Sequence, residues 1–394
     1  VRLQLQRTIA LSGGHPRSLR GLYDALLPAV SETRLRQEIL KGCRADWKEV
    51  VQRGIHFFAR DTAHDLLLVL ANDRQRAELS SALSRVLQCA EVQTYQFKEL
   101  VEKGILHLAG QVTNPEDPKA RVDTKPALLL LLLHAARKPG CSLDPCVRQL
   151  AGLLFEDAGD LTGIVLDSDG LPTTVDPGPC ISAFSEGRLS ESAERVVCWG
   201  VGRMLVAEHH DLRSKLLGPG SQPAGASVSI VVPPEKGNLN DRNVAFDQRL
   251  SALNVGEMEI HMAPRGYPAA DCYLVKRTNV EVAGQIKLFW NGGEAAIADI
   301  RRSAQKVKTG NGALQVSRFV LLICSDIVSD ADIEKLKAAE SEDGKEAPVD
   351  EVFVAADLAK VVPRSLMRVT WMGVPPDSED DAGGTDESKD GGTP

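Results

Sequence analysis

The sequence predicts an α/β fold, with a mostly helical first part and a second part that mixes strands and helices. Through residues 1–160, apolar residues recur three and four positions apart, which is the spacing of one helix face. Three strand-like segments then follow one another with short turns, at 257–262, 270–276 and 280–288. The run 319–324 is apolar at every position, which is typical of a central strand that is covered on both faces.

The helical first part contains one segment that is expected to change type along its length. Residues 93–108 predict a helix, a turn at Lys103-Gly104 and a short strand from Ile105, an order that resembles the end of a winged-helix unit. The polar, proline-containing segment 113–124 predicts a wing or a loop. The remaining helices of this part are expected at 18–27, 32–51, 73–87, 125–137 and 144–155.

The second part begins after 157–179, a stretch rich in Gly, Asp and Pro that we interpret as a domain boundary. A long helix is expected over 190–217, because Ser190 can cap its first turn and Glu191 and Glu194 suit a helix N-terminus. The other elements expected, besides the three strands and the central strand 319–324, are strands at 228–232 and 352–354 and helices at 294–308 and 331–339. The segments 355–361 and 366–372, the latter apolar, are expected to close the domain.

The charge and composition are those of a globular protein with an acidic tail. The formal net charge is −8, but residues 377–394 hold seven acids and one base, so the rest of the chain has 45 bases and 47 acids. A nearly neutral body permits a local basic face. The tail from Pro375 cannot bury a core and is expected to be disordered.

The cysteines and the longest apolar run indicate an intracellular protein without a membrane span. The eight cysteines show no disulfide or metal spacing and are interpreted as reduced core thiols. The leucine run 128–133 is far shorter than the roughly 20 residues that a span requires, so it predicts a buried helix. No signal peptide is recognised, and the start at Val1 is compatible with a fragment of a longer protein.

A candidate site lies in the strand segments between Tyr267 and Leu288. Asp271 stands among apolar residues, and the next strand ends in Gln285-Ile286-Lys287. Hydrolysis of a phosphodiester requires a hard cation with oxygen ligands, an oriented water and a cationic group near the phosphoryl oxygens. Asp271 can hold Mg²⁺ or Mn²⁺, the Gln285 amide oxygen can assist, and Lys287 can supply the positive charge.

Strand alternation and the search for a further acid extend this hypothesis. Alternation places Glu281, Ala283, Gln285 and Lys287 on one face, and Val282, Ile286 and Leu288 on the other, against the core. The acids available are Glu194, Glu257, Glu259 and Glu281, of which the architecture favours Glu194. A phosphate-facing patch is predicted from Arg301, Arg302, Lys306 and Lys308 on one helix, with Lys276 and Arg277.

The residues alone leave plainer interpretations open. An aspartate followed by a Gln-x-Lys strand also describes a solvated sheet edge, and the basic run 301–308 also describes a solvated helix face. His209 and His210 end the predicted long helix, where they suit the helix dipole. We find no zinc spacing, no Ser/His/Asp grouping and no G-x-x-x-x-G-K-[ST] phosphate loop.

Two motifs carry a resemblance to known families. Residues 267–288 resemble the core of the restriction-endonuclease-like, PD-(D/E)xK superfamily, with Gln in the second acidic position. The segment LSGGHPRSL at 11–19 looks like a motif near the end of an ATPase module, where an arginine faces the nucleotide. Both occur in this order in the Crinkler and retrotransposon-hot-spot (RHS) group. A plain turn before a helix that begins at Pro16 is the alternative for the second motif.

The resemblance implies an organisation and a function. It implies the end of an ATPase module at 1–30, a helical and winged-helix lid at 31–160, an αβββαβ endonuclease-like domain at 180–374 and the tail at 375–394. It makes Asp271 the metal ligand, Gln285 the variant acid, Lys287 the catalytic lysine and Arg17 the nucleotide-sensing residue.

The expected activity is Mg²⁺-dependent cleavage of DNA, with ATP bound only if a P-loop domain lies upstream, in this protein or in a partner. The expected location is the nucleus, of a host cell if the protein is a secreted effector. Two alternatives remain: an inactive nuclear nucleic-acid-binding or effector protein of the same fold, and an interaction protein without a nucleic-acid role.

Overall fold

A computed structural model describes most of the second part of the chain and some segments of the first. The described residues are 73–109, 118–125, 145–155, 164–166, 172–175, 192–224, 228–233, 238–252 and 255–371 without 257, 278, 289, 291, 311–315, 326–327 and 340–343, together with residues 20, 129 and 133. The predicted Arg17 motif, the helix at 32–51 and the acidic tail lie outside the described residues, and of the predicted helix 18–27 only residue 20 is described, which is helical.

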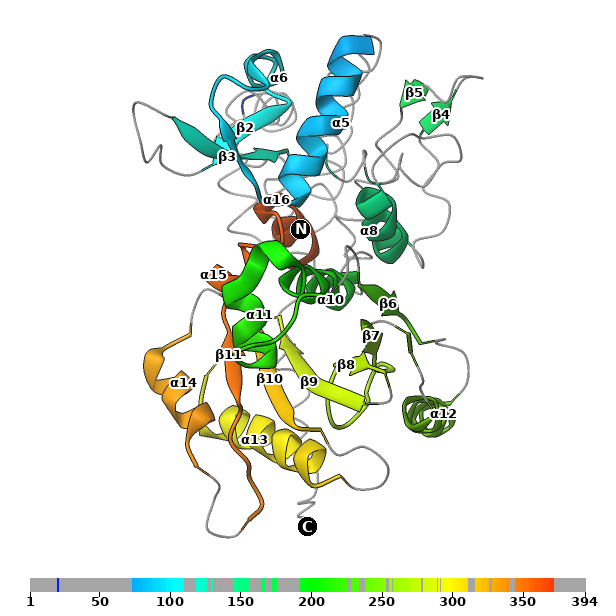
Figure 1. Cartoon of the computed structure of the whole chain (residues 1–394), viewed down its shortest axis with the longest axis vertical. Helices are drawn as coiled ribbons and strands as arrows, with labels where there is room; N and C mark the ends of the chain where they lie inside the picture. Colours follow the sequence, from blue (N-terminus) through cyan, green and yellow to red (C-terminus); the bar gives the residue numbers. More distant parts are fainter. Residues whose placement is uncertain are drawn as a thin grey trace, which may run out of the picture.

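A six-stranded mixed sheet organises the second part, in the order β11-β10-β9-β8-β7-β6 (Figure 1). β8 runs antiparallel to its neighbours β7 and β9. β6 is parallel to β7, and β10 and β11 are parallel to β9. The predicted meander of three strands is therefore observed. The strands are β6 Ser229–Val231, β7 Met258–Met262, β8 Cys272–Lys276, β9 Asn279–Lys287, β10 Arg318–Ile323 and β11 Glu351–Phe353.

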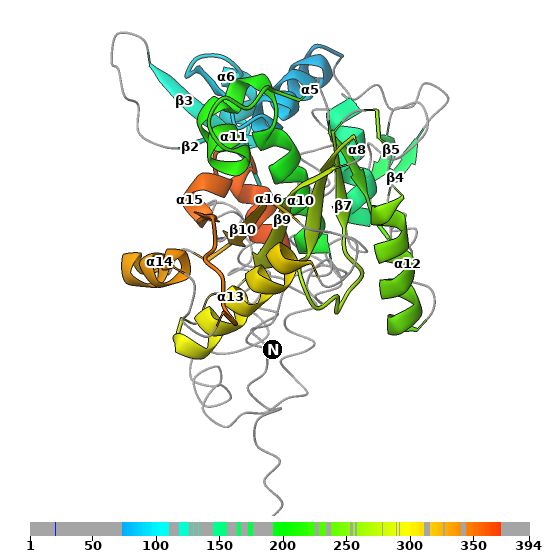
Figure 2. The ribbon, with the colours of Figure 1, turned by 60° about the horizontal axis from the view of Figure 1, so that its bottom comes forward.

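Helices cover both faces of this sheet, which explains the uninterrupted apolar sequence of β10. On one face lies α10, Ala193–Met204, whose side chains are buried along most of its length. It packs with Leu274, Val282 and Leu322 in one core cluster. On the other face lies α13, Glu294–Thr309, below β9 and β10 in Figure 2. Its residues Ile297, Ile300, Ala304 and Val307 pack in a second cluster with the alternate residues of β10, Phe319, Leu321 and Ile323.

A bulge in β9 adjusts the predicted alternation of its side chains. Leu274 pairs with Val282 and Val275 pairs with Val280, so Glu281 is an extra residue on β9. The bulge buries Val280 and Val282 in opposite core clusters although they are two positions apart. Ala283 then packs in the cluster of α13, so Gln285 and Lys287 share its face of the strand as predicted, whereas Glu281 belongs to the bulge.

The first part contains a small antiparallel sheet, β1-β3-β2, beside the helix α5, Asp73–Leu87. The predicted turn before a short strand is present at Gly104, whose φ is +71°, and β2 follows at Leu106–Ala109. The helix before the turn is shorter than predicted: α6 covers Lys98–Glu102, after β1 at Glu91–Gln93. Part of the predicted wing or loop is a strand, β3 Lys119–Thr124.

Further elements of the first part follow β3 and precede α10 in the sequence. The helix α8, Pro145–Phe155, agrees with the prediction, and two short strands, β4 Ile164–Leu166 and β5 Pro172–Val175, pair within the predicted boundary. Leu129 and Leu133, the described residues of the leucine run, are helical and fully buried, as expected for one face of a helix. No helix in the described part of the chain combines the length and hydrophobicity needed to cross a membrane.

The predicted long helix 190–217 is interrupted. The chain leaves the helical conformation at Val206, with φ −73° and ψ 164°, and continues through the short 3₁₀ helix η3, Ala207–His209, into α11, His210–Leu217. The Arg213 side chain donates to the Val206 carbonyl at 2.9 Å, which satisfies one backbone acceptor that the break exposes. The first helix begins two residues later than predicted, after Ser192.

One helix lies where no element was predicted, and the first of the last three helices is close to its predicted position. The other two lie in the segments that were expected to close the domain, without a predicted element type. The unpredicted helix is α12, Leu239–Ser251, whose cap Asn238 accepts from the Asp241 N–H at 2.9 Å. The final helices are α14 Asp330–Lys337, α15 Ala355–Leu358 and α16 Arg364–Trp371. Of these, α16 reaches the first part, because the Asp123 carboxylate on β3 accepts from the Ser365 N–H and hydroxyl.

Candidate active site

Asp271 lies at one end of the β8–β9 pair, directly before β8. Its backbone N–H donates to the Gly284 carbonyl at 2.9 Å, and its side-chain Oδ2 accepts from the Ile286 N–H at 2.6 Å. These two bonds hold the carboxylate against β9, on which Gln285 and Lys287 flank Ile286. Burial raises the pKa of Asp271, while the Ile286 N–H and the Lys287 ammonium group oppose that rise.

Glu194, in the first turn of α10, lies near enough to Asp271 and Lys287 for their charges to act on its carboxylate. Desolvation raises the pKa of Glu194 to about 7, and the charge of Asp271 adds to this rise. Arg265 and Lys287 act in the opposite direction, as positive charges near the same carboxylate. The Glu194 side chain remains accessible to solvent, so protein surrounds it without covering it. The charges of two carboxylates and two cations therefore interact here, and three of these four residues, Glu194, Asp271 and Lys287, are among the candidate site residues named from the sequence.

Gln285 has a buried polar atom without a protein partner. The amide oxygen Oε1 lies out of solvent and accepts no hydrogen bond from any described residue. A buried acceptor without a donor costs free energy, on the order of 1–3 kcal/mol. Gln285 directly precedes Ile286, whose N–H binds the Asp271 carboxylate, and an amide oxygen is one of the ligands that a hard cation takes.

Close packing below the carboxylates fixes their positions. A Cβ added to Gly284 would lie 2.8 Å from the Cys272 sulfur and 3.2 Å from Leu322 Cδ1, so only glycine lets these chains approach. Cys272 follows Asp271, and its thiol hydrogen-bonds to the thiol of Cys198, one turn after Glu194 on α10. The described cysteines are free, and those on α10, β8 and after β10 are buried, as the sequence predicted for core thiols.

The other acids named from the sequence do not join this site. Glu259 points to the side of β7 opposite Met258 and Ile260, where its carboxylate bonds to His261 Nε2 at 2.8 Å. Glu281 belongs to the bulge, toward the other end of β9, and Glu257 lies outside the described residues. Among the described residues, no group of three or more His, Cys, Asp and Glu side chains could hold a metal ion.

The predicted phosphate-facing patch is not assembled beside these carboxylates. Arg301 is the clearest correction, because its side chain is only 7% exposed. Its guanidinium donates to the carbonyls of Lys335 at 2.8 Å and Ala339 at 2.6 Å, and its Nε lies 3.1 Å from the Glu346 carboxylate. Arg301 thus fastens α13 to the end of α14 and is not on the surface.

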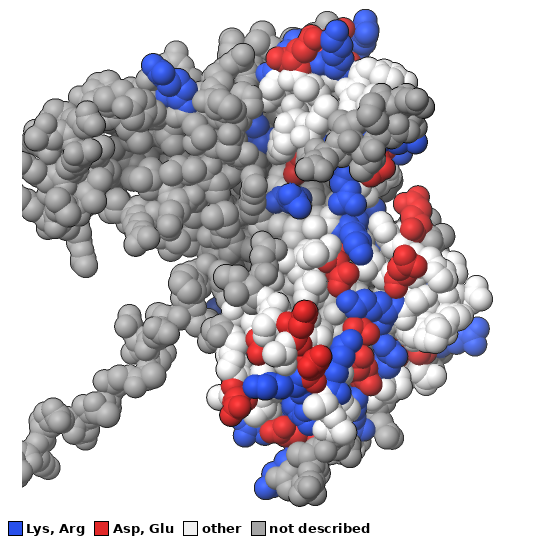
Figure 3. All heavy atoms as spheres, turned by 90° about the vertical axis from the view of Figure 1, so that its left-hand side faces the viewer, with Lys and Arg blue, Asp and Glu red and all other residues white. Residues whose placement is uncertain are grey.

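The remaining basic residues lie on the surface but not at the candidate site. Arg302 is exposed and pairs with Asp299. Lys276 ends β8, so it lies about 13 Å along the strand from the Asp271 end. Since α13 returns the chain to the start of β10, Lys306 in its last turn also lies toward that far end. On the face seen in Figure 3, basic and acidic side chains alternate without forming one basic area.

Arg265 is the site residue that the sequence analysis did not name. It lies in the connection between β7 and β8, where Gly266 has φ +79°. Loops at strand ends often carry functional side chains, so the position of Arg265 in the loop directly before Asp271 is a sequence signal for this residue.

Comparisons with models of known protein families, with curated proteins and with solved structures return no match.

Proposed function

We propose that this chain carries a restriction-endonuclease-like domain that cleaves phosphodiester bonds in DNA with the help of Mg²⁺ or Mn²⁺. The observation that carries the proposal is that the Asp271 carboxylate is bound to the Ile286 N–H beside Lys287, and that the charges of Asp271 and Lys287 both act on Glu194. The order α10, β7, β8, β9, α13, β10 supports it, since it contains the predicted αβββαβ series, with α11, β6 and α12 inserted after the first helix.

The residues present suit a hard divalent cation. The carboxylates of Asp271 and Glu194 and the unpartnered amide oxygen of Gln285 would hold it, and all three are oxygen ligands. When bound, such an ion supplies charge neutralisation at the scissile phosphate.

The chain's own cations would act on the substrate. Lys287, beside both carboxylates, would orient the attacking water and stabilise negative charge on the phosphoryl oxygens. Arg265, exposed in the loop before β8 and a positive charge near Glu194, would position the phosphate. The small sheet with α5 and α6 would then form the winged-helix-like part of a lid, which follows an ATPase module of the Crinkler and RHS kind.

A cleavage assay tests the proposal. Plasmid and linear DNA are incubated with the protein and Mg²⁺ or Mn²⁺, and the rate is compared for wild type, Asp271→Ala and Lys287→Ala. Both variants are expected to lose about a hundredfold or more in rate, the typical cost of removing one charge-stabilising group. Lys306→Ala, an exposed lysine on α13, is the matched control and should cleave at the wild-type rate. Equal rates in wild type, Asp271→Ala and Lys287→Ala would refute the proposal.

A catalytically inactive nucleic-acid-binding protein is the second candidate. The neutral Gln285 and the absence of a group of three metal-binding side chains among the described residues favour it. In that case wild type binds DNA in a salt-dependent way without cleaving it. Gln285→Glu then adds the missing charge, and a gain of Mg²⁺ affinity in that variant, measured by titration calorimetry, would locate the defect at this position.

A further inference from the structure

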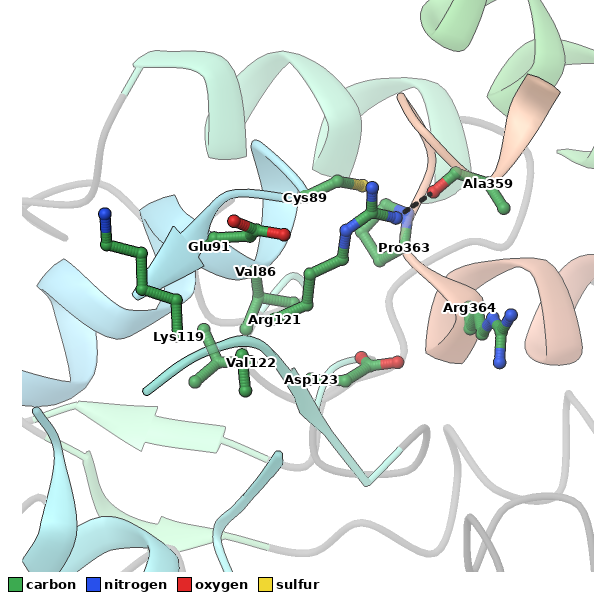
Figure 4. A pocket seen from close by; sticks show the side chains of 11 residues that line it. Val86, Cys89, Glu91, Lys119, Arg121, Val122, Asp123, Ala359, Pro363 and Arg364 are labelled. Atoms are coloured by element: carbon green, nitrogen blue, oxygen red, sulfur yellow. Dashed lines mark hydrogen bonds between the residues drawn. The ribbon is translucent and has the colours of Figure 1, made fainter. Parts of the chain in front are cut away.

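A pocket of about 260 Å³ lies between the small sheet of the first part and the turn that joins α15 to α16. Residues from the end of α5, from β1 and β3, and from the α15–α16 turn line it, and it shares no residue with the candidate active site (Figure 4). Two segments far apart in the sequence therefore form its opposite walls.

The lining is more basic than acidic. Lys119, Arg121 and Arg364 contribute three cations, and Glu91 and Asp123 contribute two carboxylates. Asp123 is already occupied: it is 6% exposed and accepts from the Thr124 N–H at 2.8 Å and from Ser365. Glu91 is therefore the carboxylate that remains accessible, opposite exposed cations from both walls.

Arg121 stands at the centre of this arrangement. Its Nη1 donates to the Ala359 carbonyl at 3.3 Å across the pocket, as Figure 4 shows. That bond uses one of the five N–H donors of a guanidinium and fixes the orientation of the others. A planar donor group held in this way matches the oxygens of a phosphate group.

Two further basic side chains lie near the Cys89 wall. Arg203 and Arg121 are the positive charges that act on the Cys89 thiol, and both also act on His209. Arg203 Nε and His209 Nε2 are buried and have no hydrogen-bond partner among the described residues. The Arg203 guanidinium stacks over the Trp199 ring at 5.3 Å, and its positive charge adds to that of Arg121 near the Cys89 wall.

Cys89 has a left-handed backbone conformation, which residues other than glycine adopt only at a cost in free energy. Helix α5 ends with the Ala90 N–H bonded to the Arg85 carbonyl and the Cys89 N–H bonded to the Val86 carbonyl, both at 3.0 Å. Cys89 has φ +51° in this Schellman ending, where glycine is usual because other residues pay about 1–2 kcal/mol. A cysteine therefore occupies a position where the backbone conformation favours glycine, and the Cys89 side chain lines the pocket.

We propose that this pocket binds a small hydroxyl-bearing phosphate monoester, with Arg121 on the phosphate and Glu91 accepting from a hydroxyl group. The volume supports a ligand larger than inorganic phosphate, since about 30 Å³ corresponds to one water in the liquid. The proposal is independent of the nuclease hypothesis, because the two sites have no residue in common.

Titration calorimetry of the full chain with glycerol 3-phosphate tests this assignment, with glycerol and sulfate as reference ligands at equal ionic strength. We expect saturable binding of glycerol 3-phosphate, no heat with glycerol and weaker binding of sulfate. Arg121→Gln should weaken binding tenfold or more, because it removes the charge-assisted bonds to the phosphate. Arg302→Gln, an exposed arginine on α13, should bind as wild type does.

Two further variants keep the test decisive. Arg364→Gln removes a cation from the opposite wall without touching the Arg121–Ala359 bond, so it should weaken binding even if Arg121→Gln unfolds. Glu91→Ala, which removes the proposed acceptor of the hydroxyl group, should lower the affinity for glycerol 3-phosphate relative to that for sulfate. Absence of saturable binding to wild type, equal affinity for sulfate, or wild-type affinity in both arginine variants would overturn the assignment.

Discussion

At the scale of single residues, the sequence singled out residues whose charges interact in the structure, whereas its predicted basic patch is not assembled. Asp271 was singled out because an aspartate among apolar strand residues is a local inconsistency, and Lys287 because it ends a Gln-x-Lys strand. Their meeting with Glu194 depends on how α10 packs on the sheet, which a strand pattern does not contain. Arg301 was misassigned, although it lies four residues after Ile297 and three before Ala304, on the apolar stripe of α13.

Arg301 and its neighbour Arg302 give a matched prediction. Arg301→Ala is expected to lower the free energy of unfolding by about 2–4 kcal/mol, because it leaves the buried carbonyls of Lys335 and Ala339 without their donors and Glu346 without its cation. Arg302→Ala removes only an exposed ion pair and should change the free energy of unfolding by less than about 0.5 kcal/mol. Urea denaturation followed by circular dichroism measures both. Equal stability of the two variants would show that the buried contacts contribute nothing.

At the scale of elements, the strands of the large sheet and most helices were placed within two residues, and the main errors are one helix break and one missed helix. The strands β7 to β11 lie within two residues of their predictions, because each is a short apolar run between turns. The break at Val206 was not predicted, because it depends on Arg213 and on the packing of α11. The helix α12 was missed because only Phe246 and Leu250 mark its buried face, within a segment rich in polar residues.

The strand β7 carries a buried histidine that should make stability depend on pH. His261 is 2% exposed, and desolvation lowers its pKa below the ordinary value, with Arg249 acting in the same direction and Glu259 opposing. The unfolded chain therefore binds a proton to this residue at a higher pH than the folded chain does. The contribution of His261 to stability is complete above a pH of about 6.5 and is lost as the pH falls below it.

The comparison of two histidine variants measures this effect. The free energy of unfolding of wild type should fall between pH 7.5 and pH 5.5, and His261→Asn should show a smaller fall, since it removes the group that titrates. His210→Asn, at an exposed position at the start of α11, should keep the wild-type slope. A slope in His261→Asn as steep as in wild type would mean that other groups cause the dependence.

At the scale of the whole molecule, the first and second parts share one core. A single cluster of buried residues runs from Leu79 on α5 through α10 and the sheet to Met367 on α16. The sequence indicated a boundary between these parts from the composition of 157–179, and the domain limits remain a prediction. It could not indicate the return of the last helix to the small sheet, because that contact joins residues 242 positions apart.

The contact between Asp123 and Ser365 is expected to connect the unfolding of the two parts. Asp123→Ala removes the acceptor of the Ser365 N–H and hydroxyl at a buried position, so the free energy of unfolding should fall by about 1–3 kcal/mol. If the shared core makes one cooperative unit, tryptophan fluorescence and circular dichroism should report the same urea midpoint in wild type. In Asp123→Ala the two midpoints should fall together, and Asp211→Ala, which removes an exposed carboxylate on α11, should leave them unchanged. Separate midpoints for the two signals in wild type would show that the parts unfold independently and that the contact between β3 and α16 does not couple them.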